Sequence, residues 1–272
     1  MVFEFWGVRG TVPVSGQDIV KYGGCTLCAS FRLLDGRIVI IDAGTGIRRL
    51  GEKLIREKGN EVLTCHIFLT HFHIDHIMGI PFFSPLYSKD ADLMFYAPAP
   101  QQETEKYLGA LMAGRLFPFD FMETPSRKSF QIAPQENFQL ESVIISSCPL
   151  RHPQGSIAYK IRGPEKTVVI STDTEHPGEG VDERLVSFVQ GVDYFVYDAF
   201  FTPGEYGAGK QGWGHSTWLA ATEVAKAASV KALYLSHFNP NHSDQKIDDI
   251  LTLAREEFAH THAAQQGLKL TL

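Results

Sequence analysis

The chain has 272 residues, of which 44% are hydrophobic, and its net charge is −6. No apolar run approaches the ~20 residues that cross a bilayer, and the N-terminus has no signal-peptide features. The four cysteines are too few and too scattered for a disulfide framework. These features predict a cytoplasmic protein with no membrane partner, and the negative charge argues against a large nucleic-acid surface.

Short apolar runs and turn signals predict a chain that contains both strands and helices. Strands are predicted at residues 2–6, 27–34, 37–41, 65–69, 93–96, 143–148, 157–161, 167–171, 194–197 and 233–235. Helices are predicted at residues 47–58, 101–112, 181–190, 217–228 and 244–259. Because hairpins and alternating strands and helices occur together, we expect an α/β fold with two mixed β-sheets face to face and helices outside.

We expect one domain over residues 1–272, since this length can bury a sizeable core. Residues 97–130 are the largest segment that resembles an insertion, and they are aromatic and mixed in charge. We expect this segment to serve as a lid or a dimer contact.

The densest group of potential metal ligands lies at residues 71–76. His71, His73, Asp75 and His76 follow directly after the apolar run 67–69. Because residues two apart in an extended segment point to the same side, His71 and His73 can share one ion. Asp75 and His76 begin a short predicted helix and are turned toward a second position. Imidazole and carboxylate suit zinc, with manganese or iron as alternatives.

Further ligand-capable residues follow other buried strands. Asp173, Asp198 and His237 come after the apolar runs 168–170, 195–197 and 233–235, and His152 follows the strand at 143–148. Sites in layered α/β folds lie where strand ends converge. A single histidine after a strand is more often an ordinary surface residue, but a dense cluster that needs completing favours ligands here. The sequence therefore predicts one composite metal site.

The spacing His-x-His-x-Asp-His at 71–76, followed by a distant His, Asp and His, resembles the metallo-β-lactamase superfamily along essentially the whole chain. The resemblance implies an αβ/βα sandwich with two zinc ions at one edge. It implies that His71, His73 and His152 hold the first zinc. It implies that Asp75, His76 and His237 hold the second, with Asp173 between the two ions. Asp42, at the end of an early strand, would orient ligands or loops.

A second stretch, Gly214-His215-Ser216-Thr217, is similar to the RNase Z-like phosphodiesterases of this superfamily. In those proteins the histidine works with an acidic residue at the preceding strand end, and here Asp198 has that position. The resemblance implies the catalytic residues Asp75, Asp198 and His215, with attack by a metal-bound hydroxide and His215 as proton donor. Ser216 or Thr217 could instead cap the following helix.

The opening residues 5–11 and 22–24 are similar to bacterial relatives of this branch that act on cyclic nucleotides or phosphoribosyl cyclic phosphates. A small phosphodiester substrate and a homodimer are therefore expected. Processing of tRNA 3′ ends is the first alternative, although we find no basic arm for gripping tRNA. Thioester hydrolysis is a further alternative, but it would not account for His215. A non-catalytic metal-binding protein is the alternative of another class; a missing metal ligand would support it, and none is missing. For Arg9 and Thr11, contact with phosphate or base competes with a role in the turn.

Overall fold

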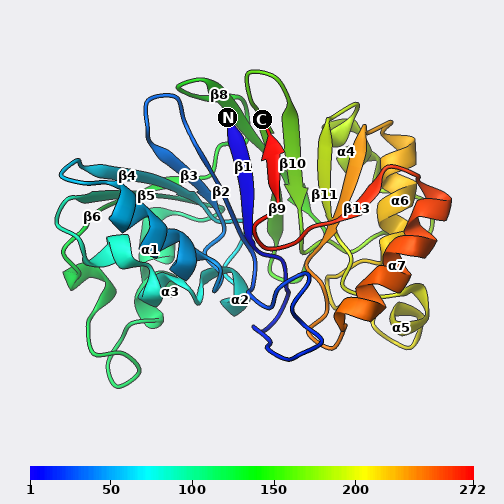
Figure 1. The fold of residues 1–272 in the computed structure, drawn as a ribbon, viewed down its shortest axis with the longest axis horizontal. Helices are drawn as coiled ribbons and strands as arrows, with labels where there is room; N and C mark the ends of the chain where they lie inside the picture. Colours follow the sequence, from blue (N-terminus) through cyan, green and yellow to red (C-terminus); the bar gives the residue numbers. More distant parts are fainter.

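The computed structural model describes residues 1–272 and contains two seven-stranded sheets that face each other (Figure 1). The first sheet has the order β14 (Lys269–Thr271), β1 (Val2–Gly7), β2 (Cys28–Arg32), β3 (Ile38–Ile41), β4 (Leu63–Phe68), β5 (Ala91–Ala97) and β6 (Arg127–Ile132). The second has the order β13 (Thr261–Ala263), β12 (Ala232–Ser236), β11 (Tyr194–Asp198), β10 (Thr167–Ser171), β9 (Ser156–Arg162), β8 (Val143–Leu150) and β7 (Phe138–Leu140). The predicted fold class is confirmed.

Helices cover the outer faces of both sheets (Figure 1). Helices α1 (Ile47–Glu57) and α3 (Gln101–Ala110) lie outside the first sheet, and α4 (Glu183–Val189), α6 (Trp218–Ala227) and α7 (Asp244–Glu257) lie outside the second. The short helices are α2 (Ile74–Ile77), α5 (Pro203–Gly207) and the 3₁₀ turns η1 (Ile80–Phe82), η2 (Ser84–Tyr87) and η3 (Phe121–Glu123). None of the helices combines the length and the apolar composition required to span a membrane.

Each sheet is mixed, with one parallel half and one antiparallel half. Strands β3, β4, β5 and β6 run parallel, as do β10, β11, β12 and β13. In the register of these pairs Ile41 lies opposite Phe68, and Ser171 lies opposite Tyr197. Parallel neighbours end at the same edge of a sheet, so the residues that follow these strands gather there.

The core between the sheets holds this edge in place. A cluster of 47 buried residues fills the space between the sheets and beneath the helices of the second sheet. Within it, the Phe68 ring stacks on Tyr96 with centroids 4.2 Å apart and meets Tyr159 edge-on at 5.5 Å. Tyr159 also donates a hydrogen bond from its hydroxyl to the carbonyl of Leu69, at 2.9 Å. Burying each such ring contributes about 1.5–3 kcal/mol, so the chain just before His71 is firmly anchored.

The strands that sequence reasoning missed are those at the sheet edges. Strands β6 and β14 border the first sheet, and β7 and β13 border the second. Each has a single buried residue, namely Phe130, Leu270, Leu140 and Thr261 respectively. An edge strand with one buried position has no alternating apolar pattern, which is the signal that predicts a strand.

Candidate metal centre

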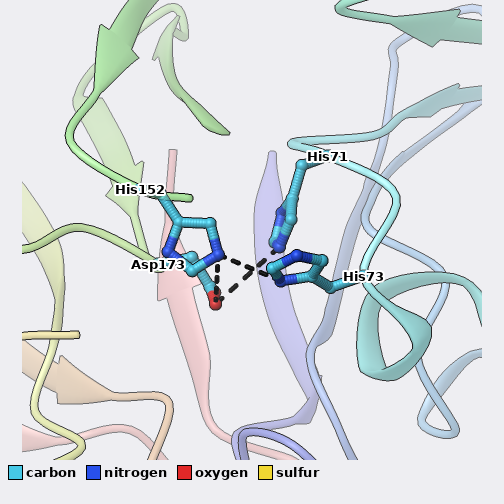
Figure 2. A group of neighbouring side chains, drawn as sticks. All are labelled: His71, His73, His152 and Asp173. Atoms are coloured by element: carbon cyan, nitrogen blue, oxygen red, sulfur yellow. Dashed lines mark hydrogen bonds and ion pairs between the residues drawn. The ribbon is translucent and has the colours of Figure 1, made fainter. Parts of the chain in front are cut away.

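The ends of the strands bring all of the predicted metal ligands together. One group consists of His71, His73, His152 and Asp173, which converge from separate segments (Figure 2). The second group consists of Asp75, His76, Asp173 and His237. Within each group the ligand atoms lie within 4.8 Å of one another, and Asp173 belongs to both. The grouping matches the two sets that the sequence resemblance implied.

Three residues of this edge have backbone in the left-handed region. They are Asp42, Asp173 and His237, with φ of 57°, 59° and 57°. Asp42 and His237 are the first residues after β3 and β12, and Asp173 is the second residue after β10. Asp and His adopt this region more readily than most residues, but the conformation still costs about 1–3 kcal/mol. Local contacts hold it in place, such as the bond from the Asp173 amide to Oδ2 of Asp198 at 3.0 Å. Such strained residues concentrate at functional sites.

Hydrogen bonds on the far side of the imidazoles select which nitrogen faces the centre. Nδ1 of His76 donates to Oδ2 of Asp42 at 2.8 Å, and Nδ1 of His152 donates to the carbonyl of Gly214 at 2.8 Å. Nδ1 of His71 lies 3.0 Å from the Thr70 hydroxyl. In each ring this leaves the lone pair of Nε2 for a metal ion. Asp42 therefore has the orienting contact that was expected of it.

His73 is oriented the other way around. Its Nε2 donates to Oε1 of Gln154 at 3.1 Å, so that Nδ1 is left to face Nε2 of His152 at 3.0 Å. Thr70, Gln154 and the Gly214 carbonyl were not identified from the sequence. Only the position of Thr70 next to His71 offered a signal.

The electrostatics of the centre fit a divalent cation. Nε2 of His76 and Nε2 of His237 lie 2.9 and 3.1 Å from Oδ2 of Asp173. That oxygen and Nε2 of His71 are buried and have no hydrogen-bond partner in the chain. A carboxylate oxygen and two imidazole nitrogens at these distances can hold a cation between them. Imidazole nitrogens and carboxylate oxygens are ligands that zinc, manganese and iron accept.

The directions in which the pKa values of Asp173 and His76 are shifted also indicate a site for a cation. Burial alone would raise the pKa of Asp173, but the imidazoles of His237 and His76 hold it well below its usual range. Burial alone would lower the pKa of His76, but the carboxylates of Asp173, Asp75 and Asp42 raise it well above its usual value. The carboxylates of Asp173 and Asp75, whose pKa values are both lowered, are therefore ionised at neutral pH and attract positive charge into the space between the ligands.

A histidine and carboxylate pair lies beside the ligands. Nδ1 of His215 donates to Oδ2 of Asp198 at 3.1 Å, and the His215 ring stacks on Phe200 with centroids 4.4 Å apart. Asp198 is fully buried, and its Oδ1 accepts hydrogen bonds from the amides of Ser216 and Phe200. Burial alone would raise the pKa of Asp198, but His215 and His237 lower it to about 2. Thr217 caps α6, which was the predicted alternative for that residue.

The opening segment supports the centre through its backbone. The amide of Thr11 donates to Oδ2 of Asp75 at 2.7 Å, and a Cβ added at Gly10 would overlap the ring of His237. Arg9 is fully buried, and its guanidinium donates to the carbonyls of Gly23, Asn239 and His242. A contact of Arg9 with phosphate or base is therefore wrong, and its role lies in holding the turn.

Two cavities open onto the centre, and His73 lines both. A polar cavity of about 650 Å³ is bounded by Asp75, Asp173, His215, Lys210 and Trp213 among others. A second cavity of about 470 Å³ is bounded by His71, Phe72 and Tyr107 among others. The largest cavity, of about 710 Å³, lies between residues 13–25 and the start of α1 and contains none of the ligands.

The comparison with known families agrees with this geometry. The model of the beta-lactamase superfamily domain matches residues 37–238. The chain belongs to this superfamily. It is a metal-dependent hydrolase, as predicted.

Individual members of the superfamily match along nearly the full length of the chain. A ribonuclease Z from Latilactobacillus sakei subsp. sakei is 23% identical, with 96% of this chain and 94% of that protein covered. The crystal structure of the metallo-beta-lactamase fold protein YhfI from Bacillus subtilis has a TM-score of 0.73 at 19% identity, covering 99% of each chain. A diphosphatase from the PhnP family has a TM-score of 0.70 at 19% identity, covering 100% of this chain and 97% of that one. The ribonuclease Z relatives agree with the predicted RNase Z-like branch.

Proposed function

We propose that this superfamily member is a dinuclear zinc phosphodiesterase that hydrolyses a small phosphodiester, such as a cyclic nucleotide or a cyclic phosphate. The observation that carries the proposal is the position of His215. It is oriented by Asp198 and lines the polar cavity together with Asp75 and Asp173 of the metal centre. A proton donor beside a metal pair suits the cleavage of a phosphate ester that releases an alkoxide.

The two groups of neighbouring His and Asp side chains suggest which residues would hold each zinc ion. His71, His73 and His152 would hold the first zinc, and Asp75, His76 and His237 the second. Asp173 would bind both. When bound, the metal pair would lower the pKa of a shared water and neutralise the charge on the phosphoryl oxygens.

The remaining steps belong to side chains of the chain itself. Asp198 fixes the His215 ring through Nδ1 and leaves Nε2 toward the polar cavity. From there Nε2 donates a proton to the oxygen of the departing alcohol. The stacked ring of Phe200 restricts rotation of His215, so the donor is held in place before the substrate binds. Lys210, at the same cavity, adds a positive charge that attracts an anionic substrate.

The size of the site and the charge of the chain support a small substrate. The polar cavity of about 650 Å³ lies within the ~300–1,000 Å³ range of small-molecule sites. The net charge of −6 does not favour a long nucleic acid. Cleavage of precursor tRNA is the second candidate, because ribonucleases Z are among the relatives that match along the chain.

A substrate panel tests the proposal. The zinc-loaded protein is incubated with 3′,5′- and 2′,3′-cyclic mononucleotides, cyclic dinucleotides and a precursor tRNA. We expect hydrolysis of at least one cyclic nucleotide, and cleavage of the tRNA alone would contradict the proposal. The single domain over 1–272, the homodimer and the cytoplasmic location are further proposals, and sedimentation of the purified chain tests the homodimer.

A further inference from the structure

The second cavity at the metal centre is chemically unlike the polar cavity. We call it the apolar cavity; its walls include Phe72, Tyr107, Pro98, Pro100, Leu150 and Ile157. The rings of Phe72 and Tyr107 lie 4.9 Å apart at an angle of 41°. His71 and His73 also line it, so a group held beside them would lie next to the first metal position. Glu103 is the single acidic or basic residue of its wall apart from these histidines.

Two polar groups of the apolar cavity are available to a ligand, namely a buried hydroxyl without a partner and the NH₂ group of an exposed amide side chain. Ser156 lines the cavity and is 3% exposed, and its hydroxyl oxygen makes no hydrogen bond. Gln154 accepts from His73 through Oε1, which leaves its amide NH₂ group available. Buried polar groups are nearly always hydrogen-bonded in native proteins. A flat apolar ligand with polar atoms on its edge would pack against the apolar wall and would also form hydrogen bonds with these polar groups.

The polar cavity is less suited to such a ligand. Its tryptophan, Trp213, has the ammonium group of Lys210 over its ring at 3.8 Å from the centroid, whereas the Lys106 ammonium lies 5.8 Å from the centroid of Tyr107. Carboxylates of Asp75, Asp173 and Glu205 also line that cavity. Because His215 lies there, the departing oxygen of a phosphodiester faces the polar cavity. The substituent that stays on the phosphorus is then free to extend into the apolar cavity.

We propose that the apolar cavity binds the nucleobase of the substituent that stays on the phosphate. The base stacks on the Tyr107 ring and forms hydrogen bonds with Ser156 and Gln154. The substrate class is therefore a nucleoside phosphodiester. This inference rests on the proposed phosphodiesterase function.

Two synthetic esters with the same leaving group test the inference. Thymidine 5′-(p-nitrophenyl) phosphate and methyl p-nitrophenyl phosphate both release p-nitrophenolate, and they differ in the retained substituent. For the zinc-loaded protein we expect kcat/KM for the nucleoside ester to be about tenfold higher or more, which is the size of a base-stacking contribution. Tyr107→Ala should remove most of that advantage and leave the methyl ester within about twofold.

Further variants keep the test informative. Ser156→Ala should lower kcat/KM for the nucleoside ester alone. Because Tyr107 is 39% exposed, the replacement of Tyr107 leaves the core intact. Tyr87→Ala is the matched control: Tyr87 is 37% exposed and lines neither cavity, so both rates should stay unchanged.

The outcomes separate the two proposals. Equal kcat/KM for the two esters, or insensitivity of the nucleoside ester to Tyr107→Ala, would overturn the base site and leave the phosphodiesterase standing. Loss of the nucleoside advantage in Trp213→Ala but not in Tyr107→Ala would place the base in the polar cavity and also overturn the inference. Cleavage of neither ester would overturn the proposed function, and the base site with it.

Discussion

Replacing His215 by alanine is expected to separate two kinds of substrate. A cyclic nucleotide releases an alkoxide, which needs a proton as the P–O bond breaks. A p-nitrophenyl ester releases p-nitrophenolate, which is stable as an anion at neutral pH. If His215 supplies the proton, His215→Ala slows the first reaction far more than the second.

The expected size follows from how firmly the donor is held. The His215 side chain is 13% exposed, bonded to Asp198 at 3.1 Å and stacked on Phe200 at an interplanar angle of 15°. A positioned general acid contributes about 10²–10⁴-fold, or roughly 3–5 kcal/mol of the barrier. We expect a loss in kcat of that order for the cyclic nucleotide and of about tenfold or less for the p-nitrophenyl ester.

The assay compares kcat for both substrates in the wild type and the variant, with the metal content measured on the same samples. His260→Ala, which replaces an exposed histidine outside the site, is the control and should change neither rate. Equal losses on the two substrates at unchanged metal content would refute the role as proton donor. They would show instead that His215 acts on a step that both reactions share.

Three further predictions concern metal binding and stability. Asp173→Asn should lower the metal content of both positions and His71→Ala that of one, because Asp173 is the ligand common to both groups; metal analysis after dialysis measures this. Gly10→Ala should weaken metal binding without unfolding the chain, since the added Cβ would overlap the His237 ring; chelator competition measures the affinity. His66 should make the fold acid-sensitive, because burial, and then the charge of Arg37, lowers its pKa from 6.5 to about 4. Below pH 6.5 the unfolded chain binds a proton that the folded chain excludes, so the free energy of unfolding falls as the pH drops. His66 should account for a loss of about 2 kcal/mol between about pH 7.5 and pH 5, measured by urea unfolding.

Matched variants check these expectations. Gly109→Ala adds a Cβ that meets nothing within 4 Å, so it should leave the metal affinity unchanged. His66→Gln should flatten the acid dependence, and an unaltered pH profile would show that the folded imidazole takes up its proton freely. Full metal content in Asp173→Asn would mean that this carboxylate does not join the two positions.

Much of the fold was predictable because the central strands are strongly patterned. Residues 67–68 and 195–197 lie in strands with both faces buried, so they form continuous apolar runs. The edge strands β6, β7, β13 and β14 were not predictable, because each buries one residue. The pairing of β14 also depends on β1, which lies at the other end of the chain.

The sequence by itself predicted which residues gather at the candidate metal centre. Four of these residues lie close together in the sequence, namely His71, His73, Asp75 and His76. Their spacing alone places them within reach of shared ions. Distant residues such as Asp173 could be chosen because each follows a buried strand, and parallel strands end at a common edge.

Only the tertiary structure decided how the centre is oriented and what surrounds it. The Thr11 amide on Asp75, the Gly214 carbonyl on His152 and the ring of Phe200 on His215 join segments far apart in the chain. These contacts depend on the register between strands and on the left-handed turns at their ends, which no local pattern encodes. For the same reason the two cavities that His73 lines, and with them the proposed base site, emerged only from the folded chain.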